Sequence, residues 1–269
     1  MARRARSGFP DGPLRTSMGM VELRRDNDGV MVLIDGIESS HLDLDDPTHL
    51  VFEYMQQMIT VLELTHGERE RLSAVHLGGA GCALPRAIDA LWRQPRQLAV
   101  ELDAELAAGV RQWFDLPRAP RLRIRVGEAR SELTTMATGS TDVLVRDAFQ
   151  GRVVPPHLTT TEFTDQVQRV LRADGLYLAN LADSPPLPSA RREAATVSSV
   201  FEHVVVIAEP GVLKGRRYGN ILLAASQSPV HRVGLARALR TLPAPAAVIP
   251  EDSLTDFIAG AIPLADPLE

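Results

Sequence analysis

A strand, a glycine-rich loop, a helix and a second strand that ends in an acid follow one another between residues 75 and 103. The loop reads Gly78-Gly79-Ala80-Gly81, and the second strand carries Glu101 near its end. Glycines let the backbone turn tightly and approach a ligand, and an acid about 20 residues further on can accept hydrogen bonds from ribose hydroxyls. The layout therefore predicts a nucleotide-binding crossover with Glu101 at the ribose.

The glycine loop alone leaves two interpretations open. Leu84 stands where dinucleotide-binding folds have a third small residue for close packing of helix on strand, which disfavours a nicotinamide or flavin cofactor. The simpler interpretation is a glycine turn of any parallel α/β unit, with Glu101 a solvated acid at a strand end.

Strands and helices continue to alternate along the chain. We expect helices at 104–113, 129–136, 161–171 and 190–200, and strands at 122–126, 141–147, 175–181, 204–209 and 218–226. This rhythm predicts an α/β fold with a largely parallel sheet and helices on both faces, in which ligands bind at the carboxyl ends of the strands. The glycine loop, Glu101, Gly127, Glu128 and Asp147 all fall at such ends. We therefore expect a single site there.

The remaining segments suggest how the chain is divided. We expect a disordered leader at 1–15, a small β domain at 16–47, the main domain at 48–228 and a helical extension at 229–269. Turn signals between short alternating runs support the β domain, and helical spacing from Thr48 to Leu64 opens the main domain. The extension could cover an edge of the sheet or dock on a second subunit.

Composition excludes several classes of function. The chain has 269 residues, of which 45% are hydrophobic, so it can bury a proper core. Its net charge of -5, without a basic stripe, disfavours a nucleic-acid partner. Cys82 is the only cysteine, which excludes an internal disulfide and fits a cytoplasmic protein. Apolar runs of membrane length and histidines at metal-binding spacing are missing, so we expect no membrane association and no metal.

Two further groups of charges allow both a structural and a functional interpretation. Asp43, Asp45 and Asp46 could hold a cationic substrate near an entrance, although acids before a helix are usually a solvated cap. Arg146 precedes Asp147, and in a regular strand it points to the opposite face, where a salt bridge or a helix contact is expected.

The motifs together resemble those of the spermidine synthase family, the polyamine aminopropyltransferases. The matching segments are 78–81, 100–103, 127–129, 142–147 and 171–175, with a hairpin at 33–36. The resemblance extends over roughly residues 20–226. It implies a class I methyltransferase-like Rossmann fold with a small N-terminal β-hairpin domain.

The resemblance also implies a ligand and roles for residues. The ligand would be an adenosine sulfonium nucleoside, with decarboxylated S-adenosylmethionine or S-adenosylmethionine as co-substrate and no tightly bound cofactor. Glu101 would bind the ribose beside the loop glycines Gly78, Gly79 and Gly81, Gly127 and Glu128 would lie beside the adenine, and Asp147 would be the catalytic base. An amine acceptor and a homodimer are the partners that the resemblance suggests.

This chain departs from the family pattern on the side of the amine. The pattern has an Asp where Gly81 stands, a second Asp where Gln150 stands, and a Tyr on the first long helix, near His49 and Leu50, for which the sequence offers no clear counterpart. We therefore expect an altered acceptor site. Two other functions stay open, an S-adenosylmethionine-dependent methyltransferase and a non-catalytic protein that binds a nucleoside or a partner.

Overall fold

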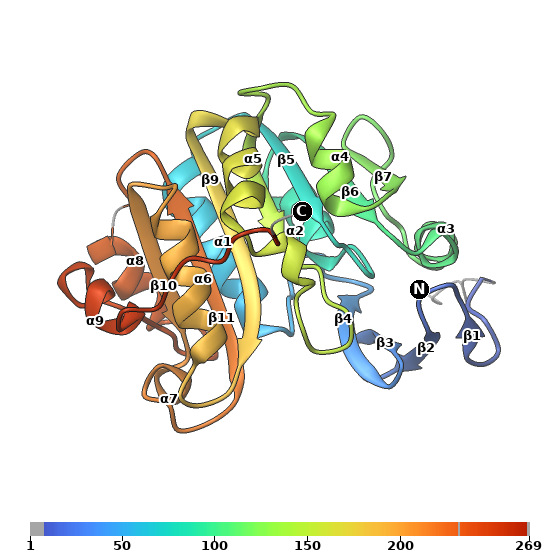
Figure 1. The fold of residues 1–269 in the computed structure, drawn as a ribbon. Helices are drawn as coiled ribbons and strands as arrows, with labels where there is room; N and C mark the ends of the chain where they lie inside the picture. Colours follow the sequence, from blue (N-terminus) through green and yellow to red (C-terminus); the bar gives the residue numbers. More distant parts are fainter. Residues whose placement is uncertain (1–7, 231, 268–269) are drawn as a thin grey trace.

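Two sheets organise residues 8–230 and 232–267, which a computed structural model of the chain describes (Figure 1). A four-stranded antiparallel sheet has the order β1-β2-β3-β4, and an eight-stranded sheet has the order β12-β10-β11-β9-β8-β5-β6-β7. The strands are β1 (Leu14–Arg15), β2 (Met20–Arg25), β3 (Gly29–Ile34), β4 (Ile37–Asp43), β5 (Arg71–Leu77), β6 (Gln94–Glu101), β7 (Leu122–Val126), β8 (Thr141–Arg146), β9 (Leu171–Asp183), β10 (His203–Ala208), β11 (Gly219–Ser226) and β12 (Ala247–Val248).

Helices connect most strands of the larger sheet. They are α1 (Glu53–His66), α2 (Ala83–Leu91), α3 (Ala104–Trp113), α4 (Ala129–Thr134), α5 (Thr161–Val170), α6 (Pro188–Ser198), α7 (Pro210–Leu213), α8 (Arg232–Leu239) and α9 (Leu254–Ile258), with short 3-10 turns η1 (Pro156–Leu158) and η2 (Glu251–Ser253). None of the helices in these described ranges combines the length and hydrophobicity that crossing a membrane requires.

The larger sheet is mixed rather than uniformly parallel. Strands β5 to β9 pair in parallel, whereas β10, β11 and β12 join antiparallel at the β9 side. The chain leaves β5 toward β6 on one side and later returns to β8 on the other. Such a reversal of strand order opens a crevice at the carboxyl ends of the strands, where ligands bind. The α/β fold with a small N-terminal antiparallel sheet is thereby confirmed.

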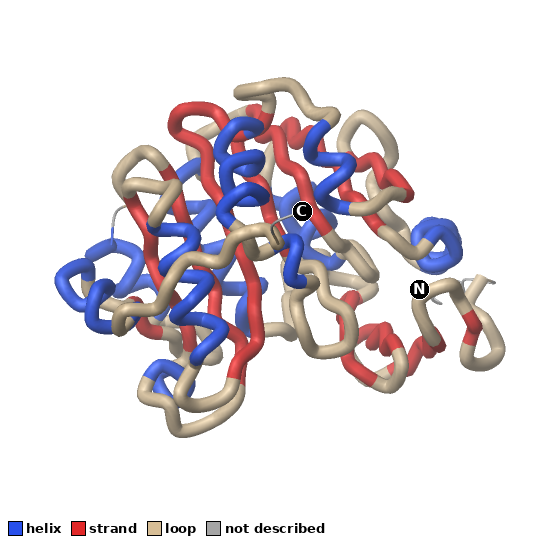
Figure 2. The backbone as a smooth tube through the Cα atoms, viewed as in Figure 1, coloured by secondary structure: helices blue, strands red, loops and turns tan. Residues whose placement is uncertain are grey.

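Helices cover both faces of the larger sheet (Figure 2). One apolar cluster joins α1, α2, α3 and α8 with the small sheet, and a second joins α4, α5, α6 and α9 on the other face. In α5 the capping Thr160 accepts a hydrogen bond from the Phe163 amide, and Phe163, Val167 and Val170 are fully buried. Burial of each such side chain stabilises the fold by about 1.5–3 kcal/mol.

The first long helix begins later than the sequence predicts. α1 starts at Glu53, not at Thr48, and Phe52 is its N-cap residue. The Asp46 carboxylate accepts hydrogen bonds from the amide and hydroxyl of Thr48, which holds that residue in a turn. Side chains of this kind offer the backbone an alternative to the helix.

The C-terminal extension also differs in detail from the expectation. α9 ends at Ile258 because Ala259 (φ 52°) and Gly260 (φ 74°) are left-handed, a common way to end a helix. Beyond them an extended strap follows, in which Leu264 accepts a hydrogen bond from the Thr161 amide at 2.7 Å. Strand β12 pairs with β10, so the described part of the extension covers an edge of the sheet.

The expected disordered leader can be compared with the structure only in part. Residues 1–7 lie outside the described residues, and Leu14–Arg15 form the edge strand β1. The domain boundaries proposed from the sequence stay a prediction.

Candidate active site

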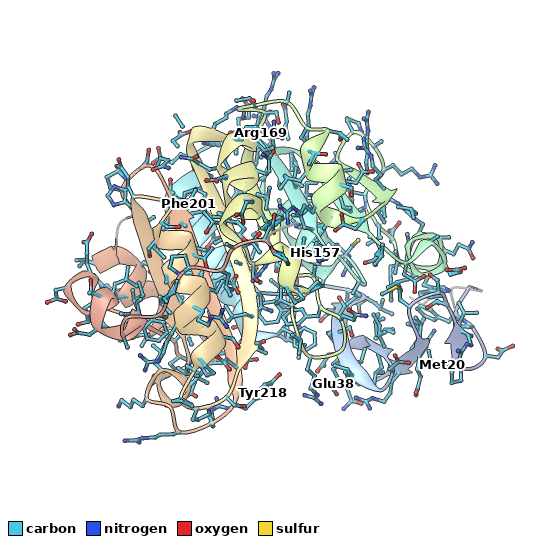
Figure 3. All side chains as sticks on the ribbon, in the orientation of Figure 1. Met20, Glu38, His157, Arg169, Phe201 and Tyr218 are labelled. Atoms are coloured by element: carbon cyan, nitrogen blue, oxygen red, sulfur yellow. The ribbon has the colours of Figure 1, made fainter. Side chains whose placement is uncertain are left out.

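A cavity of about 640 Å³ opens at the carboxyl ends of the parallel strands, beneath the small sheet. Its lining includes six of the residues singled out from the sequence, namely Gly78, Gly79, Glu101, Gly127, Glu128 and Asp147. In Figure 3, Glu38 comes from the small sheet, His157 from the 3-10 turn η1, and Tyr218 from the segment just before β11. The fold thus brings the predicted residues into one site.

Unlike Gly78 and Gly79 in the same loop, Gly81 does not line the cavity. A Cβ atom at this position would lie 2.5 Å from Leu42 Cδ1 and 2.9 Å from Ser40 Oγ, both on β4. The small sheet therefore packs directly on the loop. Gly78 has a φ of +82°, and a Cβ there would overlap the backbone of Asp147, so this glycine lets two strand ends meet.

The Glu101 carboxylate is held by backbone amides at the cavity wall. One oxygen accepts from the Ala80 amide at 3.2 Å and the other from the Asp103 amide at 3.1 Å. Burial raises the pKa of Glu101 above its ordinary value, and these amide bonds offset part of the effect. The glycine loop therefore fixes the acid that the sequence assigns to the ribose.

Glu128 is the N-cap of α4 and is fully occupied by its neighbours. Oε1 accepts from the Arg130 amide at 2.9 Å and contacts His157 Nε2 at 3.0 Å, while Oε2 accepts from the Ser131 amide and hydroxyl at 2.7 and 2.8 Å. Burial acts to raise the pKa of Glu128, but the hydrogen bonds outweigh it and lower the pKa to about 2. Glu128 is therefore ionised at neutral pH.

Asp147 follows β8 and is held by two side chains from other elements. The Tyr54 hydroxyl on α1 donates to Oδ2 at 2.9 Å, and the Asn180 amide on β9 donates to Oδ1 at 2.9 Å. Burial raises the pKa of Asp147, an effect that the Asn180 and Tyr54 hydrogen bonds only partly reverse. A carboxylate with a raised pKa that is fixed at a cavity wall is suited to accept a proton.

Comparison with solved structures decides the family. The crystal structure of a probable spermidine synthase from Corynebacterium glutamicum matches with a TM-score of 0.90 and 38% identity, over 97% of this chain and 98% of that one. The chain belongs to the spermidine synthase family. It is a divergent, spermidine-synthase-like member.

A more distant curated relative agrees with this assignment to the spermidine synthase family, and a further solved structure shares the fold. The polyamine aminopropyltransferase of Neisseria meningitidis is 26% identical over 226 residues, which is 84% of this chain and 80% of the relative. Human methyltransferase-like protein 13, solved in complex with SAH, shares the fold at a TM-score of 0.57 and 21% identity, over 71% of this chain and 93% of that one. No model of a known protein family matches the sequence.

Two residues that contact Asp147 were missed from the sequence of this spermidine-synthase-like chain. Tyr54 lies within the helical spacing predicted from Thr48 to Leu64, shortly after His49 and Leu50, near which the family pattern has its tyrosine. Asn180 was one polar residue in an apolar strand, Leu178-Ala179-Asn180-Leu181. The feature of Asn180 that indicates a role is its place near the end of β9. Because β9 is parallel to β8 and next to it, the carboxyl ends of the two strands lie side by side.

Behind Asp147, a buried ion pair joins the strands to α6. Arg146 Nη1 lies 2.7 Å from Glu193 Oε1, and both side chains are almost inaccessible to solvent. The Arg146 guanidinium also donates to the carbonyl oxygens of Leu158 at 3.2 Å and Asn180 at 2.8 Å. The salt bridge expected for Arg146 is therefore present, on the face opposite Asp147. The Arg146 guanidinium also holds the backbone of Asn180, whose side chain contacts Asp147.

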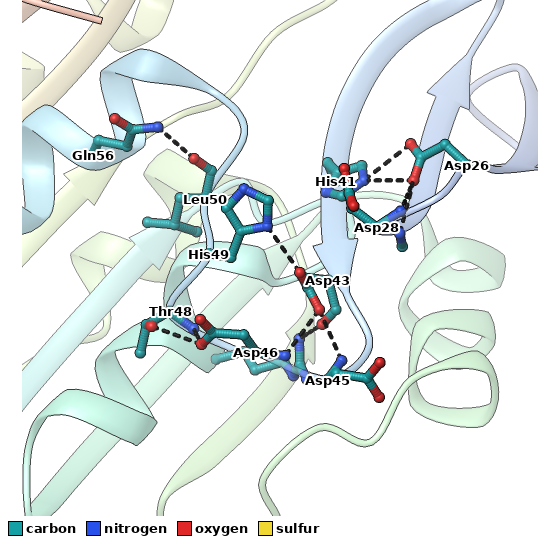
Figure 4. A network of polar contacts seen from close by, with 12 residues as sticks. Asp26, Asp28, His41, Asp43, Asp45, Asp46, Thr48, His49, Leu50 and Gln56 are labelled. Atoms are coloured by element: carbon teal, nitrogen blue, oxygen red, sulfur yellow. Dashed lines mark hydrogen bonds and ion pairs between the residues drawn. The ribbon is translucent and has the colours of Figure 1, made fainter. Parts of the chain in front are cut away.

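The acidic cluster near residue 45 belongs to the junction between the sheets and does not line the cavity (Figure 4). The Asp43 carboxylate accepts from the amides of Asp45 and Asp46, both at 2.8 Å, and contacts His49 Nδ1 at 2.8 Å. Burial opposes ionisation of Asp43, yet the hydrogen bonds lower its pKa to about 2. These contacts favour the structural interpretation of the cluster over the substrate one.

Proposed function

We propose that this chain transfers an aminopropyl group from decarboxylated S-adenosylmethionine to an amine, with Asp147 as the general base. The observation that carries the proposal is the Asp147 carboxylate, which is partly buried at the wall of a cavity and bonded by Tyr54 and Asn180. Membership of the spermidine synthase family supports the reaction type.

The reaction requires that the amine be held in line with the reacting carbon and that one base accept its proton. The lone pair of the amine nitrogen attacks the methylene carbon bonded to the sulfonium sulfur, a C–N bond forms and the C–S bond breaks. The electrons of that bond go to sulfur, which leaves as methylthioadenosine, and the amine proton goes to Asp147. Holding the two reactants in line supplies most of the acceleration, and a base of raised pKa accepts the proton.

The nucleoside end of the cavity supports binding of the adenosine portion. Glu101 lies beside the glycine loop, where its carboxylate can accept from the ribose hydroxyls, and Gly127 and Glu128 form the wall assigned to adenine. Because Glu128 already has four hydrogen-bond partners, a base amino group would reach it only by displacing His157.

The acceptor side supports an altered amine specificity. Gln150 lines the cavity where the family pattern has an acid, and a neutral amide cannot form an ion pair with a distal ammonium group. We expect putrescine to be a poor acceptor, and Gln150→Asp to raise its use. Gly81→Asp would not help in the same way, because a side chain at Gly81 meets Leu42 and Ser40.

Replacement of Asp147 tests the proposal. Asp147→Asn should reduce transfer by about 10²-fold or more, while calorimetry shows that methylthioadenosine still binds. The control is Asp165→Asn, which changes an exposed acid on α5. Equal turnover by Asp147→Asn and the unmodified protein would remove Asp147 from the mechanism.

A methyltransferase is the second candidate, favoured by the likeness to methyltransferase-like protein 13. Titration with S-adenosylmethionine, its decarboxylated form and methylthioadenosine separates the two, because selective binding of the carboxylated nucleoside would favour methyl transfer. Nucleoside binding without turnover of any amine would favour a non-catalytic binding protein.

A further inference from the structure

The charged side chains that line the cavity differ in whether they have hydrogen-bond or ion-pair partners within the protein. Its acidic residues are Asp35, Glu38, Glu101, Asp103, Glu128 and Asp147, and its basic residues are Arg24, Arg152 and His157. The partners of each group show which charges are free to meet a ligand.

Every acid of the lining accepts a hydrogen bond from another group of the protein. Glu101 and Glu128 belong to the nucleoside end, as described above. Asp35 accepts from the Met20 amide at 2.8 Å, and Asp103 caps α3 through the Leu106 amide at 2.9 Å. Glu38 forms an ion pair with Arg24 at 2.6 Å. Asp147 accepts from Tyr54 and Asn180, so none of these carboxylates is without a hydrogen-bond partner.

Arg152 differs from these acids in its partners. In the described ranges its guanidinium has neither a hydrogen bond nor an ion pair, although Arg24 and His157 each pair with an acid. Arg152 lies at the tip of a tight turn, because Gln150 and Val153 bond each other's backbone at 2.8 and 3.3 Å and Gly151 between them has a φ of +64°. The turn directly follows Asp147, so an unpaired cation lies near the proposed base in sequence and lines the same cavity.

We propose that the acceptor is a primary amine whose far end carries a carboxylate, and that Arg152 binds this carboxylate. The inference rests on the proposed function, whose bond-forming step is unchanged. A diamine would bring its second ammonium group to a lining with an unpaired cation, where each carboxylate already has a hydrogen-bond partner, whereas a carboxylate would gain a charge-assisted hydrogen bond from Arg152. The like-charge contact acts against the diamine.

The test uses three acceptors of matched length, 4-aminobutanoate, butylamine and putrescine, titrated by calorimetry into the protein saturated with methylthioadenosine and into the protein alone. We expect 4-aminobutanoate to bind at least about tenfold more tightly than putrescine, with butylamine between them. Arg152→Gln should abolish the preference, and Arg152→Glu should reverse it in favour of putrescine. Arg123→Gln, which changes an exposed arginine on β7 outside the cavity, is the control and should keep the preference.

The outcomes separate this proposal from the proposed function. Tighter binding of putrescine to the unmodified protein, an unchanged ratio in Arg152→Glu, or no binding of any acceptor overturns the acceptor proposal. Binding in the expected order without release of methylthioadenosine in a turnover assay contradicts aminopropyl transfer and leaves the carboxylate preference standing.

Discussion

The half of the cavity proposed for the nucleoside (the nucleoside half) is held largely by backbone groups. The half proposed for the acceptor (the acceptor half) is built from side chains that different elements contribute. At the nucleoside half, Glu101 is held by amides of its own crossover unit, and Glu128 by amides of the helix that it caps. At the acceptor half, Asp147 depends on Tyr54 from α1 and Asn180 from β9. Local sequence thus determines the first half, and long-range packing determines the second.

The largest effect on stability is expected from breaking the ion pair between Arg146 and Glu193, which lies behind Asp147. Arg146→Met should lower the free energy of unfolding by about 3–5 kcal/mol, because it leaves Glu193 charged and buried without a partner. Arg146→Met combined with Glu193→Leu should be neutral or even stabilising, because both desolvation costs disappear. Denaturant titration measures both variants. A single variant as stable as the double one would show that Glu193 is not held as a buried charge.

The nucleoside half is tested by Glu101→Gln. Loss of a hydrogen bond to a charged group should weaken binding of methylthioadenosine by about 1.5–3 kcal/mol, with the fold retained because the amide oxygen still accepts from the loop. Calorimetry gives the affinity, and Glu68→Gln, an exposed change before β5, is the control. Unchanged affinity in Glu101→Gln would assign Glu101 a structural role only.

The packing between the small sheet and the glycine loop is tested by Gly81→Asp. The new side chain must displace Leu42 and Ser40, and we expect a loss of stability of about 1–3 kcal/mol, the usual cost of overpacking. Gly139→Asp is a comparison at an open turn, where a Cβ meets no atom within 4 Å. That turn also has a positive φ, so its own cost is backbone strain alone. If Gly81→Asp is as stable as the unmodified protein, the sheet is free to move off the loop.

The smallest expected effect comes from Tyr54→Phe at the acceptor half. The Tyr54 hydrogen bond lowers the pKa of Asp147, so its loss should raise that pKa further. Transfer requires ionised Asp147 and is lost as pH falls through this pKa, so the acid limb of the rate profile should move to higher pH. At neutral pH we expect a loss of about two- to tenfold, or ~0.5–1.5 kcal/mol.

The matched control for Tyr54→Phe is Tyr177→Phe. Tyr177 is a buried tyrosine that stacks on Phe201 and does not line the cavity. Its replacement should leave the acid limb in place. An acid limb that moves equally in both variants would point to a general change in the protein rather than to the Asp147 contact.

Asp147 also connects function with stability. Its folded-state pKa lies above the ordinary value, so its contribution to stability is present at low pH and is lost as pH rises through the folded pKa. At pH 8 the ionised, partly desolvated carboxylate therefore destabilises the protein. We expect Asp147→Asn to unfold at a temperature no lower than the unmodified protein at pH 8, as thermal scans would measure; a clear decrease would contradict the raised pKa.

The sequence by itself determined the α/β rhythm, the glycine loop, and the positions of Glu101, Gly127, Glu128 and Asp147 at strand ends. These features are local, because period, turn chemistry and strand termination are determined by neighbouring residues. The same local information placed Arg146 on the face opposite Asp147, since successive side chains alternate across a strand.

Only the tertiary structure decided what surrounds Asp147. Tyr54 and Asn180 are far from it in the sequence, and the helical spacing around Tyr54 does not show which polar group its hydroxyl meets. Likewise, the residues next to Gly81 in the sequence do not show that Leu42 and Ser40 fill the space where its side chain would lie. The physical reason is the same in each case: contacts between separate elements depend on how the sheets pack and on which strands become neighbours, and the residues on either side of a position do not encode that arrangement.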